Sequence, residues 1–585
     1  MTVEKLITDH IDIWSSALQT RSTAGRGSNG KIDLYGIKKL RELILELAVR
    51  GKLVPQDPND EPASELLKRI AVKKAELVKQ GKIKKQKPLP EISEDEKPFE
   101  LPVGWEWQRL IELGSWAIGS GFPNSIQGVS DESILMCKVS DMNLQGNEKF
   151  IKATNNTISD ELASQKKINV SEPGTVIFPK IGGAIATNKR RILVKKTAID
   201  NNCLGIRPFN LINLEWFFLI LNVIDMAKYQ SGTSVPAINQ SVIGNILIAL
   251  PSEGMQARIV EKVEELMSLC DQLEQQSLTS LYAHSQLVET LLATLTDSQN
   301  AEELAENWAR ISQYFDTLFT TEASIDALKQ TILQLAVMGK LVPQDPSDEP
   351  ASELLKRIDQ EKAQLVKEGK IKKQKPLPPI SDEEKPFVLP QGWEWIKFGN
   401  IGDIKGGGTP SKNNPDFWDG DIPWISPKDM KVDYISQGEL SISENAVMNS
   451  SVHLIKENSL LFVVRGMILA HTFPAAVTER EVTINQDMKA ITTNLFNTDF
   501  LLKMIQGSSG RVLPLVDRSS HGTCKLVSER IFNLVLPVPP LEEQIRISKH
   551  VNMLLNICNR LKANLHLAQQ TQLHLADALT DAALN

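Results

Sequence analysis

Residues 47–70 read LAVRGKLVPQDPNDEPASELLKRI, and residues 335–358 read LAVMGKLVPQDPSDEPASELLKRI. The matched glycines Gly51 and Gly339 set the offset between the copies at 288 residues. Both copies continue without insertion into GKIKKQKPLP, which begins at Gly81 and at Gly369. Because self-similarity at a fixed offset indicates a repeated architecture, we expect one structural frame to be used twice.

Further residues, C-terminal to each copy of the motif, are related by the same offset. They are Trp105 and Trp107 against Trp393 and Trp395, and Gln256 and Arg258 against Gln544 and Arg546. The tryptophans are most simply packing anchors. Between these borders, residues 110–251 and 398–539 resemble each other only weakly, although Asp141-Met142 aligns with Asp429-Met430. We interpret them as two variable domains of one fold, set in a repeated frame.

Hydrophobic spacing predicts the helices of the frame. Apolar residues at positions 40, 43, 44 and 47 predict an amphipathic helix that ends at Gly51, and a second helix fits residues 63–79. Long helices are predicted over residues 256–294 and 542–582, each spanning roughly 60 Å at 1.5 Å per residue. Such helices suit an antiparallel coiled-coil spacer between two domains, although each could instead only cover the core of its own domain.

The variable segments mix short β-branched runs, such as 175–178 and 460–464, with helices near 216–227 and 498–506. The expected fold class is therefore mixed α/β, with two similar α+β domains separated by long helices and related by a pseudo-twofold internal repeat. We divide the chain into an N-terminal helix and flexible linker (1–35), a first frame (36–109), a first variable domain (110–251), a first spacer helix (252–299), a central linker with the second frame (300–397), a second variable domain (398–539) and a second spacer helix (540–585).

Composition narrows the class of protein. A chain of 585 residues with 41% apolar and 23% charged residues is expected to fold into several globular domains. No apolar run reaches the roughly 20 residues that cross a bilayer, and the start does not resemble a secretory signal, so we expect a cytoplasmic protein. The net charge of -7 excludes a uniformly basic nucleic-acid binder. The five cysteines are widely spaced and are expected to be buried thiols.

Signatures of catalysis are weak throughout the sequence. The glycine-rich GRGSNGK at residues 25–31 has Ile32 where a phosphate-binding loop needs Ser or Thr, so it is interpreted as a linker. No Asn-Pro-Pro-aromatic or Asp-Pro-Pro-Tyr tetrad of an amino-methyltransferase occurs. We expect the chain to have no catalytic residues and no metal site.

Two variable domains in matched frames, each followed by a long helix, resemble the specificity subunits of type I restriction-modification systems. The repeated GKLVPQDP and EPASELLKRI motifs resemble the subclass with long N-terminal and central repeats. The resemblance implies two target-recognition domains that each read one half of a bipartite site on double-stranded DNA. It further implies two methyltransferase (M) subunits and restriction/translocation (R) subunits as partners. S-adenosylmethionine, ATP and magnesium are then expected on those partners, and no cofactor on this chain.

Candidate DNA contacts are loop residues whose side chains can reach bases or phosphates. The candidates are Thr187, Asn188, Lys189, Arg190, Arg191, Gln230, Ser231 and Thr233 in the first domain, and Lys405, Thr409, Ser411, Lys412, Ser426, Lys428, Arg518, Ser519, His521 and Thr523 in the second. The Gly-rich loop that carries Thr409 is expected to be flexible. Each of these residues could equally be part of an ordinary solvated turn.

Two identical basic segments, which we call the straps, complete the set of candidates. Their lysines are Lys82, Lys84, Lys85 and Lys87 in the first copy and Lys370, Lys372, Lys373 and Lys375 in the second. Because the segments are identical, any contact they make is expected to be with the DNA backbone or with identical partner subunits. Soluble linkers are the alternative. For the whole chain, the alternatives are a free-standing DNA-binding regulator and a scaffold that does not bind DNA.

Overall fold

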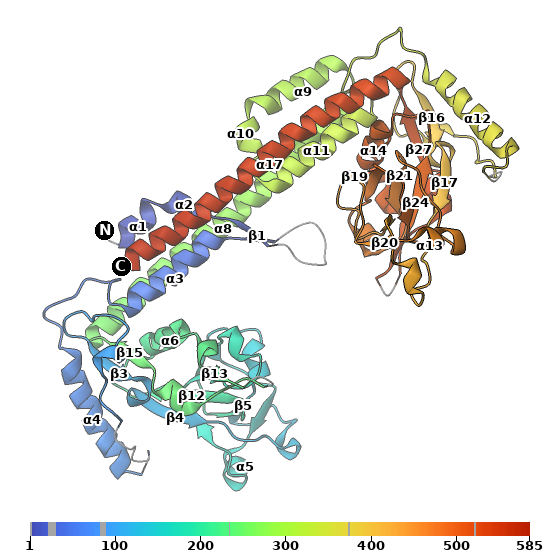
Figure 1. Ribbon diagram of the computed structural model, residues 1–585. Coiled ribbons are helices and arrows are strands. Elements are labelled where there is room, and N and C mark those ends of the chain that lie inside the picture. The colour runs from blue at the N-terminus through green and yellow to red at the C-terminus, as the bar shows by residue number, and fades with distance from the viewer. Residues whose placement is uncertain are drawn as a thin grey trace. The chain divides into compact units, whose positions relative to one another are not determined.

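A computed structural model describes residues 3–21, 31–81, 83, 89–232, 235–371, 375–519 and 522–584. It divides into two compact units (Figure 1). Unit 1 comprises Met1–Leu18, Leu34–Ser277 and Gln572–Asn585, and unit 2 comprises Gln19–Asp33 and Leu278–Thr571. Each unit contains one of the two variable domains, so the repeat in the sequence corresponds to a division of the structure.

The predicted frame helices are confirmed in unit 1. Helix α3 (Tyr35–Val49) buries all four of the predicted apolar positions, and α4 (Ala63–Lys79) has the predicted bounds. Helix α3 packs against the first part of α8 (Glu253–Asp297), where Arg41 bonds Glu274 at 2.6 Å. It also contacts the last part of α17 (Leu541–Leu584), where the Tyr35 hydroxyl donates to Asp577 at 2.7 Å.

Unit 2 repeats this arrangement with α11 (Glu322–Val337) and α12 (Ala351–Lys367). Here Lys562 on the first part of α17 donates to Asp326 of α11 at 2.8 Å. Val288 and Leu292 of the last part of α8 join the same hydrophobic core as Ile325 of α11. Helix α8 thus begins in unit 1 and ends in unit 2, whereas α17 begins in unit 2 and ends in unit 1.

The N-terminal segment, for which a helix and a linker are expected, and the central segment, for which a linker is expected, both contain secondary structure. The N-terminal segment forms α1 (Val3–Thr8), α2 (Ile11–Ser16) and an antiparallel pair of β1 (Gln19–Arg21) with β2 (Lys31–Asp33). The central segment forms α9 (Ala301–Gln313) and α10 (Phe315–Leu318). Helix α9 begins because the Asn300 side chain accepts the Glu303 amide and acidic residues fill the first turn.

The two variable domains share one fold, as expected. The main sheet of the first has the order β4-β12-β9-β10-β6, and that of the second has the order β17-β24-β21-β22-β19. In both, the second strand of this order is antiparallel to its two neighbours and the last pair is parallel. The bounds are β4 Gly114–Ile118, β12 Cys203–Pro208, β9 Val176–Pro179, β10 Arg191–Leu193 and β6 Phe150–Ile151, against β17 Asp403–Gly406, β24 Met488–Thr492, β21 Leu460–Val463, β22 Ala475–Thr478 and β19 Tyr434–Ile435.

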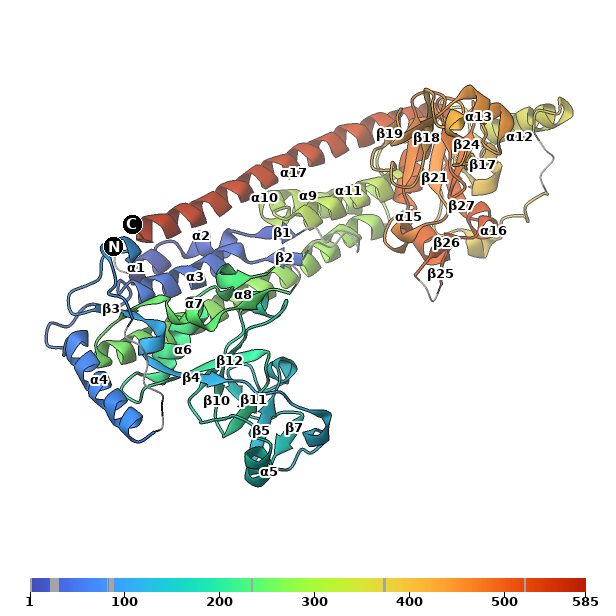
Figure 2. The same cartoon turned by 60° about the horizontal axis from the view of Figure 1, so that its bottom comes forward.

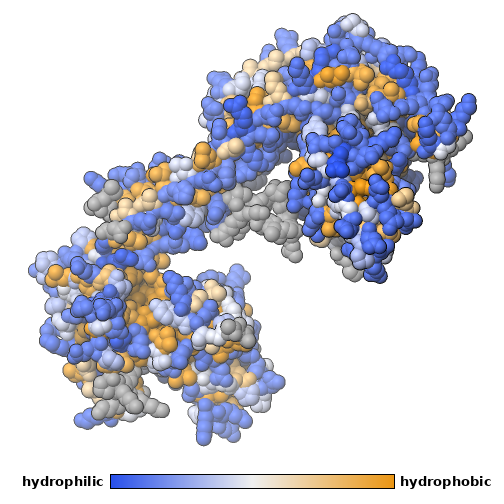
Figure 3. Space-filling view, viewed as in Figure 1, coloured by the Kyte–Doolittle hydropathy of each residue, from blue (hydrophilic) through white to orange (hydrophobic). Residues whose placement is uncertain are grey.

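A second sheet lies beside the first in each domain. Its order is β7-β5-β11-β8 in the first domain and β20-β18-β23 in the second. The strands are β7 Asn156–Ile158, β5 Ile134–Cys137, β11 Thr197–Ile199 and β8 Val170–Ser171, against β20 Leu440–Ile442, β18 Ile422–Ile425 and β23 Thr483–Ile484. Most residues of these strands are buried, and the surface in view is largely hydrophilic (Figure 3), as expected of globular domains.

Each domain is closed where its two ends pair. Strand β3 (Glu106–Arg109) pairs with β15 (Leu247–Leu250), and β16 (Glu394–Lys397) pairs with β27 (Val535–Val538). Trp105, Trp107 and Trp393 are less than a tenth exposed, and the Trp107 ring centroid lies 4.9 Å from that of Phe99. These tryptophans are therefore packing anchors, as predicted.

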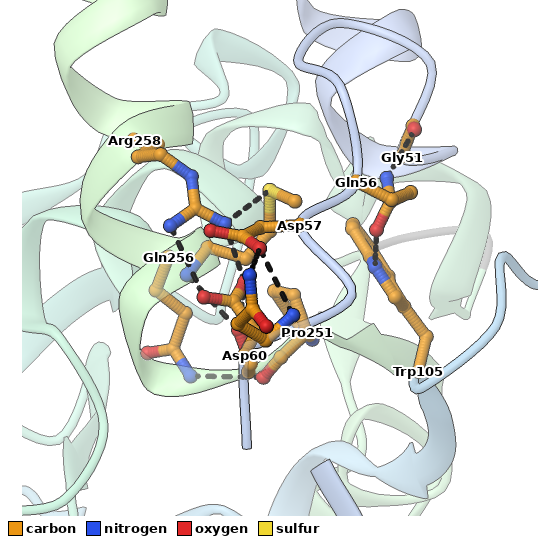
Figure 4. Close-up of polar contacts among 11 residues, drawn as sticks. Gly51, Gln56, Asp57, Asp60, Trp105, Pro251, Gln256 and Arg258 are labelled. Carbon is orange, nitrogen blue, oxygen red and sulfur yellow. Dashed lines mark hydrogen bonds and ion pairs between the residues drawn. The ribbon is translucent and has the colours of Figure 1, made fainter. Parts of the chain in front are cut away.

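The repeated Gln-x-Arg motif fastens each domain to its long helix, and Figure 4 shows the first copy. The Gln256 side chain accepts the backbone amide of Asn213 at 2.8 Å and donates to the Pro251 carbonyl at 3.3 Å. Its counterpart Gln544 makes the same two bonds, to the Asn497 amide and the Pro539 carbonyl. Asn213 and Asn497 cap α6 (Leu214–Val223) and α14 (Thr498–Gly507).

The arginine of the same motif forms a second tie. Arg258 makes a two-pronged ion pair with Asp60, and Arg546 makes the same pair with Asp348, with a closest distance of 2.6 Å. The arginine lies on the long helix and the aspartate in the VPQDP turn region of the frame. The motif repeated at the 288-residue offset therefore joins frame, domain and helix in the same way twice.

Two further predictions concern the burial of the cysteines and the absence of a membrane-spanning segment. All five cysteines are buried and free, as expected. Within the described residues, no helix combines the length and apolar character needed to cross a bilayer.

Candidate nucleic-acid interface

Four segments meet at one end of the sheets in each variable domain, and we call this region the loop edge. In the first domain it consists of residues 118–121, 180–183, 200–202 and the strands β13 (Gln230–Ser231) and β14 (Ala237–Ile238). In the second it consists of residues 406–409, 464–467, 485–487 and the strands β25 (Val516–Arg518) and β26 (Cys524–Leu526). Figure 2 shows β25 and β26 side by side at the margin of the second domain.

Backbone hydrogen bonds join the segments of the first domain in a chain. The Ser120 amide donates to the Ile199 carbonyl, the Lys180 amide to the Asn202 carbonyl and the Ile238 amide to the Lys180 carbonyl, each at 2.8 Å. These bonds connect the Gly-rich loop, the two inter-strand loops and the hairpin in turn. The loop edge is therefore one bonded surface rather than a set of independent turns.

The second domain contains the same chain of bonds. The Gly408 amide donates to the Ile484 carbonyl at 2.9 Å, and the Val464 amide donates to the Asp487 carbonyl at 2.8 Å. The Leu526 amide donates to the Val464 carbonyl, also at 2.8 Å. Two sequences that resemble each other weakly thus form one kind of loop edge, and different side chains occupy matched places on it.

Glycine is required where the Gly-rich loop approaches its neighbour. A Cβ atom at Gly407 would lie 1.9 Å from the Asn485 carbonyl oxygen, and one at Gly119 would lie 1.8 Å from that of Asp200. Such contacts are impossible for any larger residue. The expectation of a flexible Gly-rich loop is therefore corrected, because its glycines allow close packing of two backbones.

Several polar side chains lie on the loop edge of the second domain. Gln486 is exposed, and the Thr409 hydroxyl donates to its side-chain carbonyl. Arg465 is 48% exposed, with its guanidinium 3.5 Å from the Asp487 carboxylate. Arg518 donates to the Ala470 carbonyl at 2.8 Å. A neutral amide that is held by a hydrogen bond, in a loop edge that also carries two arginines, can form directional hydrogen bonds beside an anionic polymer.

The first domain places Asn201 at the position of Gln486. Asn201 is the second residue of the loop between β11 and β12, and Gln486 is the second residue of the matched loop between β23 and β24. Both side chains are exposed. Sequence reasoning missed Asn201, Gln486 and Arg465. The fixed offset of 288 pairs Asn201 with Lys489, whereas the loops correspond at an offset of 285, since Ile199 is matched by Ile484.

Among the candidates in the first domain, the prediction that Arg190 contacts DNA is wrong. Its side chain is 2% exposed and donates to the carbonyls of Leu221 at 3.1 Å and Ile224 at 3.0 Å, and to the Asn188 side chain at 2.7 Å. Burial lowers the pKa of Arg190 to about 10. Because its donors cap the last turn of α6, Arg190 is a structural residue and not a DNA contact.

The remaining candidates of the first domain differ in how available they are. Arg191 is half-buried and donates to the Met142 carbonyl at 3.0 Å, and Lys189 donates to the Asn143 side chain. The Thr187 hydroxyl donates to the Ala184 carbonyl at 2.6 Å. Gln230 and Ser231 are exposed on β13, within the loop edge. Thr233 lies outside the described residues.

The second domain presents its predicted residues at several places. Ser426 donates to Asp429 at 2.7 Å and so stabilises a turn. Thr409 and Arg518 belong to the loop edge, and His521 lies outside the described residues. Lys405 is half-buried on β17, whereas the exposed candidates are Ser411, Lys412, Lys428, Ser519 and Thr523.

Most of the strap lysines lie outside the described residues, namely Lys82, Lys84, Lys85, Lys87, Lys372 and Lys373. Of the two that are described, Lys370 is exposed and pairs with Glu368 at 2.8 Å, and Lys375 is exposed. Their predicted role in backbone or partner contacts stays a prediction.

Comparison with known proteins identifies the class of the two domains. The family model of the type I restriction modification DNA specificity domain matches residues 133–282 and 390–568, which contain most of both variable domains. The chain is 50% identical to the EcoAI type I restriction enzyme specificity subunit and 48% identical to the EcoEI one, both from Escherichia coli. Each alignment covers 100% of both chains. Both variable domains are thus DNA-specificity domains of the restriction-modification class.

The chain belongs to the specificity subunits of type I restriction-modification systems. It also resembles a chain solved in work on complex assembly and conformational transition of the type I R-M system. That chain is 18% identical, with a TM-score of 0.46, over 83% of this chain and 99% of the other.

Proposed function

We propose that this specificity subunit reads a bipartite site on double-stranded DNA, with one half read by each loop edge. The observation that carries the proposal is that one bonded scaffold presents different side chains in the two domains, Asn201 in one and Gln486 in the other. A shared scaffold can approach DNA in the same way twice, and different side chains at matched places select different bases.

The repeated frame supports a proposal about partners. Identical bonds from Gln256 and Gln544, and identical ion pairs at Arg258 and Arg546, produce two equivalent surroundings on one chain. Pseudo-symmetry of this kind suits two copies of one partner. We propose that two methyltransferase subunits bind these frames and that restriction/translocation subunits join the full complex in the cytoplasm. S-adenosylmethionine, ATP and magnesium would then be used by the partners.

The test is co-expression with the candidate modification subunit, followed by single-molecule sequencing that maps methylated adenines. The expected result is a split motif with two short defined parts and a fixed gap. Replacement of residues 110–251 alone should change one part, and replacement of residues 398–539 alone should change the other. Tight specific binding by the isolated chain would favour a free-standing regulator, and no DNA binding by the assembled complex would favour a scaffold.

A further inference from the structure

We propose that Asn201 and Gln486 are matched specificity-determining residues, each of which reads one A·T base pair in its half of the site. This inference rests on the proposed function, because it names the side chains that perform the reading. Both residues are exposed at the same place in the loop edge, where the preceding residues Asp200 and Asn485 donate their amides to the matched strands at 3.0 and 2.9 Å.

The chemistry of these side chains separates base reading from phosphate binding. A neutral amide cannot neutralise a phosphate, but its donor and acceptor match the N7 and N6 groups of adenine in the major groove. Phosphates are bound instead by cations, and Arg465 and Arg518 lie in the same loop edge as Gln486. The loop edge thus combines phosphate-binding cations with a directional reader.

The orientation of Gln486 is fixed before DNA arrives. The Thr409 hydroxyl donates to its side-chain carbonyl oxygen, which retains a second lone pair, while the amide nitrogen donates to no residue that the structure describes. Thr409 is itself positioned because Gly407 allows the Gly-rich loop to pack against Asn485. A reader with its orientation already set loses less conformational entropy on binding than a freely rotating one. Thr409 is therefore a positioning residue for Gln486.

The experiment measures base preference at every position of the site, with the assembled methyltransferase complex and a randomised DNA library. Gln486→Ala should lower the preference for adenine at one position of one half by about 5- to 150-fold, and Asn201→Ala should do so in the other half. Gln486→Glu, which replaces the amide donor by an acceptor, should shift the preference at that position from adenine to cytosine.

Matched controls carry the same side-chain chemistry at the far ends of the same strands. Asn494 follows β24 and Asn210 follows β12, and both are exposed. Asn494→Ala and Asn210→Ala should leave every base preference unchanged. Thermal unfolding of each variant separates loss of reading from loss of folding.

Three results would overturn the inference. Full base preference in both alanine variants would remove Asn201 and Gln486 as readers, although the bipartite site would still stand. Weaker binding with unchanged preference would assign them to the backbone instead. A wild-type complex without a bipartite motif would overturn the proposed function, and this inference with it.

Discussion

Replacement of Arg190 by alanine tests whether this buried cation stabilises the fold or contacts DNA. Its guanidinium donates to the carbonyls of Leu221 and Ile224, at the end of α6, and to the Asn188 side chain. These carbonyls have no partner within the helix, and a buried polar group without a partner costs roughly 1–3 kcal/mol. A favourable charge at a helix C-terminus adds up to ~2 kcal/mol. We expect Arg190→Ala to destabilise the first domain by about 3–5 kcal/mol.

The assay combines urea unfolding with hydrogen exchange of α6, whose last turn should exchange faster in the variant. The neighbouring substitution Lys189→Ala is the control, and its effect should stay within about 0.5 kcal/mol because Lys189 lies nearer the surface. Arg190→Lys should recover only part of the loss, since one ammonium cannot reproduce the planar fork. Unchanged stability of Arg190→Ala together with weaker DNA binding would refute this reasoning and restore Arg190 as a DNA contact.

Three further predictions concern the frame, the thiols and the spacer. Hydrogen bonds from Arg258 hold the pKa of Asp60 below its usual value, so this ion pair stabilises the fold above the ordinary aspartate pKa of about 4 and is lost as pH falls through the lower folded value. Urea unfolding at pH 7 and pH 3 should show a larger loss in the wild type than in Asp60→Asn, and equal losses would contradict the ion pair. The five buried cysteines should react with Ellman's reagent only after denaturation, and fast reaction of the native chain would show that at least one is accessible. Insertion of four residues after Ser277 in α8 and after Thr571 in α17 adds roughly 6 Å of helix, and the gap in the methylated motif should grow by about two base pairs. An unchanged gap with methylation intact would mean that these helices do not set the spacing.

The sequence by itself determined the parts of this protein that depend on local or repeated motifs. Two copies of one motif predicted two frames, and the bonds of Gln256 and Gln544 are the same because their surroundings have the same sequence. Helices α3, α4, α8 and α17 followed from apolar spacing and from the glycine that ends a frame helix. In such elements the hydrogen bonds join residues close along the chain, so the pattern is visible in one line of sequence.

Only the tertiary structure decided which loop residues share a surface and which are buried. Asn201 and Gln486 are matched through backbone bonds, and backbone groups are the same for nearly every residue type, so no sequence signature records the match. A fixed offset failed there because the intervening loops differ in length by three residues. Arg190 has the sequence of an exposed basic loop, but the end of α6, some 30 residues further along the chain, buries it. The burial of a charged side chain depends on contacts with such distant partners, and these exist only in the folded chain.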